Sequence, residues 1–276
     1  MMFDELDDES DDELNDELES KDDEKLESRA EYKLAEKTKR KKTLDGFKKN
    51  KVVNEVLDKP TVFALYDLIK SKIISYVNGV VKAGKESVLF WAVGENEIDL
   101  ALKVYLVSTS NFKKRAAYID GDPRFSKIKK GTKNLVYFWA QKEFKNLSQC
   151  YDKGLPVVKP VHVSKNILVM EFVGKNGVPA KTLLESKIDM KDYHSAISLL
   201  GRLYKEARLV HGDFSEYNIF KTEKGLILFD LGSAVDLNHP NANNFLKRDI
   251  NNISKFFAKR GLTVANPEDV ILKVIK

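Results

Sequence analysis

The order in which apolar and polar positions recur predicts strands first and helices later. Between Thr61 and Ser71 the apolar residues fall at helical spacing, which predicts a helix before the first strand. Strand-like patterns follow at residues 76–81, 88–93, 98–107, 159–163 and 166–172, and helical patterns at residues 133–152, 189–207, 245–260 and from 267 onward. This order predicts an α+β fold of two lobes.

The strand at residues 98–107 carries a lysine among apolar positions. Lys103 alternates onto the same face as Ala101 and Tyr105. A lysine in a strand is usually solvated, but this one stands about forty residues before Glu143 in a helical pattern. A strand lysine paired with a helix glutamate is how kinases orient the α- and β-phosphates of a nucleotide, and we expect that pair here. The alternative for Glu143 is a surface pair with a nearby lysine of its own helix.

Two short runs near the C-terminal end point to phosphoryl transfer. The first holds Asp213 and Asn218, and the second is Asp230-Leu231-Gly232 after the strand-like residues 225–229. Kinase chemistry needs one carboxylate for the attacking hydroxyl, and an amide with a second carboxylate to hold Mg²⁺ against the phosphates. The spacing therefore predicts a kinase-type site for ATP, with Asp213 catalytic and with Asn218 and Asp230 as metal ligands. A polar loop followed by a turn is the alternative.

Other nucleotide contacts follow from position along the chain. The hairpin turn before residue 88 stands where kinases cover the phosphates, yet it lacks the usual glycine pattern, so Lys85 and Ser87 are the predicted phosphate contacts. A plain hairpin turn is the alternative reading. Glu171 and Val173 follow an apolar strand, where a hinge would offer backbone groups to adenine. The polar stretch from about Ser108 to Thr132 predicts a mobile or binding segment rather than core.

Charge divides the chain into a tail and a domain. Residues 1–30 hold fifteen acidic and three basic residues, a net charge of −12. The whole chain has a net charge of +5, so the remaining residues carry about +17. We expect residues 1–50 to be a disordered tail, acidic and then basic. Residues 51–276 are then the domain, with lobes of about 51–170 and 171–276. Its positive surplus favours a polyanionic partner such as RNA, and we hypothesise that the acidic arm shields that surface.

Cysteine, histidine and hydropathy narrow the class of protein. Cys150 is the single cysteine, which excludes an internal disulfide and a cysteine-based metal site. The four histidines show no metal-ligand spacing, and no apolar run reaches the length of a membrane helix. No secretory signal is evident either, so we expect a cytoplasmic protein without a membrane partner.

Two departures from ordinary protein kinases are visible. Gly212 stands where most of them carry an arginine that meets a phosphorylated activation loop, so we expect no such switch. Only 46 residues follow Asp230, and no Ala-Pro-Glu triplet is among them. We therefore expect a trimmed C-terminal lobe without the usual peptide-binding groove.

With these departures, the chain resembles the RIO family of atypical protein kinases, specifically its type-1 branch. The matching stretches are residues 74–79 (ISYVNG), 84–86 (GKE), 101–105 (ALKVY), 139–144 (WAQKEF), 169–174 (VMEFVG), 211–218 (HGDFSEYN), 239–240 (HP) and 245–249 (FLKRD). They extend over about residues 55–265. One departure is Lys82-Ala83-Gly84, where the family usually has Ser-Thr-Gly and so gains hydroxyl contacts to phosphate.

The resemblance implies a bilobal protein-kinase-like fold with extra N-terminal helices and a flexible lysine-rich loop at about residues 108–132. It also implies use of ATP and Mg²⁺, autophosphorylation on serine, and ATPase activity through a phospho-aspartate on Asp230. A role in the last maturation steps of the small ribosomal subunit is implied too, with precursor rRNA and ribosomal proteins as partners.

Two other functions remain open. Aminoglycoside and choline kinases share this arrangement of two aspartates and an asparagine, but they usually build their substrate pocket in a larger C-terminal lobe. The third reading is a nucleotide-gated binding module without catalysis. The presence of Lys103, Asp213, Asn218 and Asp230 argues against it.

Overall fold

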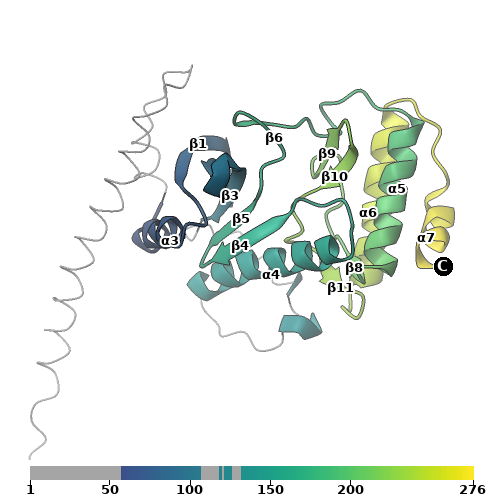
Figure 1. The fold of residues 1–276 in the computed structure, drawn as a ribbon. Helices are drawn as coiled ribbons and strands as arrows, with labels where there is room; N and C mark the ends of the chain where they lie inside the picture. Colours follow the sequence, from purple (N-terminus) through teal and green to yellow (C-terminus); the bar gives the residue numbers. More distant parts are fainter. Residues whose placement is uncertain (1–56, 107–117, 120, 126–131) are drawn as a thin grey trace, which may run out of the picture.

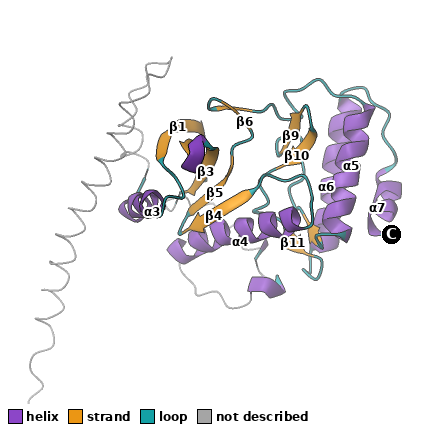
Figure 2. Cartoon of the chain, viewed as in Figure 1, coloured by secondary structure: helices purple, strands orange, loops and turns teal. Residues whose placement is uncertain are grey.

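A computed structural model describes residues 57–106, 118–119, 121–125 and 132–276 of the chain. The expected tail at residues 1–50 and most of the lysine-rich segment lie outside these residues. A sheet and two helices form one part of the molecule, and helices α5, α6 and α7 with short strands form the other (Figures 1 and 2). This is the α+β arrangement of two lobes that the sequence predicts.

The first lobe is built on an antiparallel sheet whose strands lie in the order β1-β2-β3-β5-β4. Its elements are α3 (Lys59–Lys70), β1 (Tyr76–Ala83), β2 (Ser87–Val93), the 3₁₀ turn η1 (Glu95–Glu97), β3 (Asp99–Tyr105), the 3₁₀ turn η3 (Pro123–Phe125), α4 (Thr132–Asp152), β4 (Pro160–Ser164) and β5 (Ile167–Glu171). The α-helices and strands among them lie within a few residues of their predicted positions, while the two 3₁₀ turns were not predicted. Asp58 caps α3 by accepting the Thr61 N–H at 3.1 Å.

The central strand β3 is buried on both of its faces. Leu100, Leu102 and Val104 pack in one cluster with Ala64, Leu65 and Leu68 of α3. The other face carries Ala101, Lys103 and Tyr105, and all three are buried. Ile98 was expected to begin this strand, but it lies before β3 and is 57% exposed. Because both faces of β3 are covered, Lys103 is enclosed rather than solvated.

The second lobe packs three helices against short strand pairs. Its elements are β6 (Gly174–Lys175), β7 (Val178–Pro179), α5 (Met190–Lys205), β8 (Leu209–Val210), β9 (Ile219–Thr222), β10 (Gly225–Leu228), β11 (Val235–Asp236), α6 (Ala242–Lys259) and α7 (Pro267–Ile275). Asp189 and Asp192 form a reciprocal capping box at the start of α5. Strands β8 and β11 pair, as do β9 and β10, and the loops between these strands carry the predicted site.

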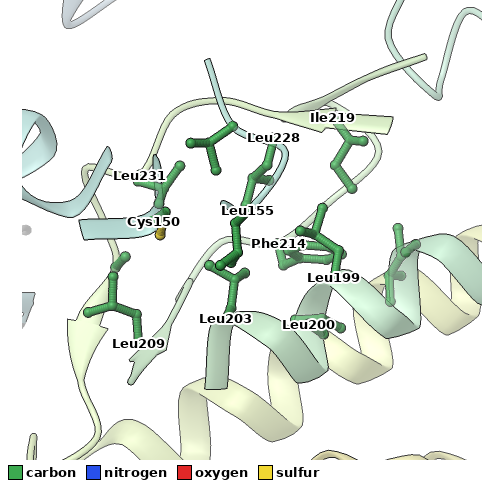
Figure 3. Packing of buried hydrophobic residues seen from close by; sticks show 14 of the residues in the cluster. Cys150, Leu155, Leu199, Leu200, Leu203, Leu209, Phe214, Ile219, Leu228 and Leu231 are labelled. Carbon is green, nitrogen blue, oxygen red and sulfur yellow. The ribbon is translucent and has the colours of Figure 1, made fainter. Parts of the chain in front are cut away.

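A continuous apolar core joins the two lobes beneath those loops. It brings Cys150 of α4 together with Leu199 of α5, Phe214 of the β8–β9 loop and Leu231 (Figure 3). Cys150 is a buried free thiol, and burial raises its pKa to about 12. None of the helices in the described part of the chain has the length and apolar character needed to cross a bilayer.

Part of the predicted polar segment belongs to the core, which corrects the expectation for its described residues. Ile119 and Phe125 are buried in a cluster with Trp139 of α4. Arg124 binds Asp122 at 2.7 Å and Asn146 of α4 at 2.9 Å. Polar composition hid these contacts because the apolar residues are few and do not follow a regular period.

Candidate active site

Lys103 and Glu143 meet in the interior, as their spacing predicts. The Lys103 ammonium donates to both carboxylate oxygens of Glu143, at 3.0 and 2.9 Å. Glu143 lies on α4, is fully buried, and also accepts a hydrogen bond from the Tyr105 hydroxyl. The alternative of a surface pair for Glu143 is therefore wrong.

The same ammonium contacts the second predicted aspartate. Lys103 Nζ lies 3.0 Å from Asp230 Oδ1. Asp230 follows β10 and is held at a φ of +58°, in the left-handed region that non-glycine residues seldom adopt. Its side chain is 43% exposed. Lys103 is thus placed between a buried carboxylate and one that faces the solvent side of the site.

The charge state of this group follows from its surroundings. Burial would lower the pKa of Lys103, but the carboxylates of Asp230 and Glu143 outweigh it and raise that pKa above its usual range. Burial raises the pKa of Glu143 to about 7, and Lys103 opposes that rise. Because Lys103 bonds both oxygens of Glu143, we take this pair as ionised. A charged ammonium beside a partly exposed aspartate is suited to binding phosphate oxygens.

Asp213 and Asn218 lie together in the loop between β8 and β9. The Asn218 amide nitrogen donates to the Asp213 backbone carbonyl at 2.9 Å and to its carboxylate at 3.3 Å. The Phe229 N–H in turn donates to the backbone carbonyl of Asn218 at 3.0 Å, which brings this loop beside Asp230. Asp213 is exposed, so an attacking hydroxyl or water can reach it.

Gly212 is required by space as well as by conformation. Its φ is +76°, and a Cβ on it would lie 2.9 Å from the Ser233 carbonyl oxygen. The absence of an arginine at this position therefore has a local steric reason.

Asp249 of α6 holds the loop that carries Asp213, a role that the sequence did not indicate. Its two carboxylate oxygens accept the N–H groups of Gly212 at 2.8 Å and Phe214 at 3.0 Å, on either side of Asp213. Burial raises the pKa of Asp249 to about 7, and the two N–H donors oppose the rise. Arg248 donates to the Gly212 carbonyl and to the Tyr118 hydroxyl. Residues 245–249 belong to the family resemblance, but a lone helical aspartate normally indicates a solvated face, so the sequence gives no sign of this contact.

For the residues predicted to contact phosphate and adenine, the structure gives only their positions in the fold. Lys85 is exposed in the hairpin between β1 and β2, and Ser87 begins β2 opposite Tyr105 of β3. Glu171 ends β5, and its side chain is exposed. Val173 lies between β5 and β6, and its carbonyl accepts the Ala180 N–H at 2.8 Å. Their roles toward ATP stay predictions.

The oxygen donors at the site suit Mg²⁺. Among the described residues, no three histidine, cysteine, aspartate or glutamate side chains gather into a metal-binding group. The set here is the Asp230 carboxylate, the Asn218 amide and the neighbouring Asp213 carboxylate. Because the Asn218 nitrogen faces Asp213, its amide oxygen is left for a cation. Mg²⁺ is commonly bound by one or two protein groups together with phosphate oxygens and water, and this set fits that pattern.

Comparison with known proteins identifies the family. The family model described as RIO domain matches residues 88–270. The chain belongs to the RIO family. It is 38% identical over 224 residues to the RIO-type serine/threonine-protein kinase Rio1 of Haloferax volcanii, covering 80% of this chain and 76% of that protein. The Rio1 of Methanocaldococcus jannaschii is also 38% identical, covering 76% and 72%. Both relatives agree with the type-1 branch.

A longer relative and a solved structure extend the comparison. Serine/threonine-protein kinase RIO1 of Caenorhabditis elegans is 35% identical, and the match covers 83% of this chain but only 46% of that protein. The crystal structure of the Rio2 kinase from Chaetomium thermophilum matches with a TM-score of 0.60 at 25% identity, over 76% of this chain and 66% of that one. A second structure of that kinase, its ADP/Mg²⁺-phosphoaspartate complex, has a TM-score of 0.58 at 24% identity and shows likeness of fold. The chain thus has the kinase-like fold of an atypical serine/threonine kinase family.

Proposed function

We propose that this RIO-family kinase binds ATP with Mg²⁺ and transfers the γ-phosphate, both to serine and to its own Asp230 with later hydrolysis. The observation that carries the proposal is that one buried ammonium bridges Glu143, at 2.9 and 3.0 Å, and Asp230, at 3.0 Å. This pairing brings a phosphate-binding cation and a metal-binding carboxylate to the same point.

Each residue has a role that its position supports. Lys103 would bind the α- and β-phosphates while Glu143 fixes its direction. Asp230 and Asn218 would hold Mg²⁺, which when bound would neutralise charge on the phosphates. Asp213 would orient the attacking serine hydroxyl, or the water that attacks an acyl phosphate.

The phospho-aspartate step needs an accessible carboxylate. In it, an Asp230 oxygen attacks the γ-phosphorus, the bond to the bridging oxygen breaks, and ADP leaves. Water then hydrolyses the acyl phosphate and restores Asp230. The 43% exposure of the Asp230 side chain supports this route. The phosphoaspartate of the Rio2 complex with ADP and Mg²⁺ is a further reason to test it here.

We infer a role in maturation of the small ribosomal subunit, with precursor rRNA and ribosomal proteins as partners and the cytoplasm as location. The support is the type-1 resemblance and the net charge of about +17 outside residues 1–30. The acidic residues 1–30 would shield the basic surface when no RNA is bound. Deleting them should then tighten RNA binding at low salt.

The test is steady-state ATP turnover with and without purified small-subunit precursors. Wild type, Asp213→Ala, Asp230→Asn and the exposed control Asp152→Asn would be compared. Stimulation by precursor, with loss in the first two variants alone, is expected. Precursor-independent transfer to a small molecule would instead support a small-molecule phosphotransferase, and nucleotide binding without turnover would leave only a binding module.

A further inference from the structure

One face of α4 contacts the loop that follows Asp230 through four side chains. Their spacing of three, four and seven residues puts them on one side of the helix: Trp139, Lys142, Glu143 and Asn146. Glu143 reaches Asp230 through Lys103, as described above. Lys142 and Asn146 bond the loop backbone directly, and the Trp139 ring lies against Gly232.

Lys142 and Asn146 bind carbonyl groups of that loop. The Lys142 ammonium donates to the Gly232 carbonyl at 2.7 Å and also to the Ala234 carbonyl. The Asn146 amide donates to the Leu231 carbonyl at 2.8 Å and to the Ala234 carbonyl at 3.0 Å. Three of the four carbonyls that follow Asp230 are therefore fixed by this one helix.

Close packing adds to these hydrogen bonds. A Cβ on Gly232 would lie 2.7 Å from Trp139 Nε1 and 3.3 Å from a carboxylate oxygen of Glu143. The loop therefore lies against α4 with no space for a side chain at this position. The Lys142 ammonium also lies 5.2 Å from the centre of the Trp139 ring.

Asp230 needs such support because its backbone is strained. The left-handed region is sterically unfavourable for a non-glycine residue, and such a conformation persists when the surrounding structure determines it. Here the constraint begins at the next residue, Leu231, and continues to Ala234. Lys142 is fully buried, and a buried ammonium is costly unless acceptors satisfy it. An apolar residue could fill the same space but could not hold the two carbonyls.

We propose that Lys142 and Asn146 are positioning residues, which hold Asp230 in the conformation that binds Mg²⁺. Together with Glu143 and Lys103 they make α4 and the Asp230 loop a single unit. This inference rests on the proposed function, because it assumes that Asp230 is a metal ligand. Their effect on nucleotide binding is therefore confined to its Mg²⁺-dependent part.

The test is the affinity for ADP, measured by calorimetry with Mg²⁺ and again with the metal chelated. The variant is Lys142→Met, which keeps a long side chain and removes the donors. The control is Lys145→Met, the same change on an exposed lysine of α4 that lies over Phe125. Substituting a residue that supports a metal ligand commonly lowers metal affinity about tenfold to a hundredfold. We therefore expect Lys142→Met to reduce the gain in ADP affinity caused by Mg²⁺ by about tenfold or more. Its affinity for metal-free ADP should stay within about twofold of wild type, and Lys145→Met should match wild type in both.

Gly232→Ala is a second variant, in case Lys142→Met does not fold. Its methyl group would push the loop away from Trp139 without removing a donor, and we expect the same selective loss of the Mg²⁺ effect. An unchanged Mg²⁺ enhancement in these variants would overturn the inference, and so would an equal loss of affinity with and without metal, because that would indicate a purely structural role. A wild-type protein without any Mg²⁺ enhancement would contradict the proposed metal site itself.

Discussion

Replacing Asp249 tests how the loop that carries Asp213 is held. The carboxylate accepts two buried backbone N–H groups, from Gly212 and Phe214, at 2.8 and 3.0 Å. In Asp249→Ala both N–H groups lose their acceptor. Each buried, unpaired donor costs about 1–3 kcal/mol, so we expect unfolding to become easier by about 4 kcal/mol. Asp249→Asn keeps one acceptor oxygen and places an amide N–H₂ against the other donor, and we expect about 2 kcal/mol.

The assay is urea unfolding of wild type and both variants, at pH 8.5. This pH lies above the raised pKa of Asp249, about 7, so the carboxylate is ionised in the folded protein. Turnover of ATP is measured in parallel, without urea. Because the two N–H groups bracket Asp213, a displaced loop should lower kcat by about a hundredfold even in the folded fraction.

The control is Asp152→Asn, since Asp152 is exposed at the end of α4. We expect it to change stability by less than about 0.5 kcal/mol. Loss of less than about 0.5 kcal/mol in Asp249→Ala would refute the reasoning, because the two hydrogen bonds would then contribute nothing. Full activity in a folded Asp249→Ala would refute the positioning of Asp213.

Three further predictions concern two residues of the site and one turn outside it. Lys103→Met leaves the buried Glu143 without its cation, so we expect a loss of about 3 kcal/mol of stability and at least a tenfold weaker affinity for Mg²⁺-ADP by calorimetry; unchanged affinity would contradict the phosphate-binding role. Burial lowers the pKa of His211 to about 4, below the unfolded value of 6.5, so its contribution to stability falls as the pH falls below 6.5. At pH 5 this amounts to about 2 kcal/mol, and urea unfolding at pH 7.5 and 5 should show a smaller loss in His211→Gln than in wild type. Gly177 and Gly154 both have positive φ, but only at Gly177 would a Cβ meet another residue, 2.5 Å from the Trp91 ring. Gly177→Ala should therefore destabilise by about 1 kcal/mol more than Gly154→Ala in urea unfolding, and equal losses would contradict the contact.

The sequence was sufficient for those parts of the site where residue type and spacing determine the chemistry. The pairing of Lys103 with Glu143 followed from a strand, a helix and about forty residues between them. The positions of the strands and helices along the chain, and the two lobes, followed from periodicity. The order of the strands within the sheet was not predicted, because periodicity does not say which strands pair. Asp213, Asn218 and Asp230 were found together because they are close in sequence as well as in space.

Residues that act through the backbone of another segment were missed. Asp249 and Lys142 are both charged and both lie on helices, where such residues are usually solvated. Asp249 accepts the backbone N–H groups of residues 212 and 214, and Lys142 donates to the backbone carbonyls of residues 232 and 234. Such backbone groups carry no mark in the sequence. Gly212 indicated a missing switch, while its steric reason became visible only when Ser233 was placed beside it.

The central claim is that Asp230 accepts the γ-phosphate, and trapping that phosphate tests it most directly. Wild type, Asp230→Asn and Asp152→Asn would be incubated with γ-labelled ATP and Mg²⁺, quenched in acid, and treated with or without hydroxylamine. The account predicts an acid-stable, hydroxylamine-sensitive label on wild type and Asp152→Asn that is missing from Asp230→Asn. An equal hydroxylamine-sensitive label on Asp230→Asn, or only a label that resists hydroxylamine in every protein, would contradict it.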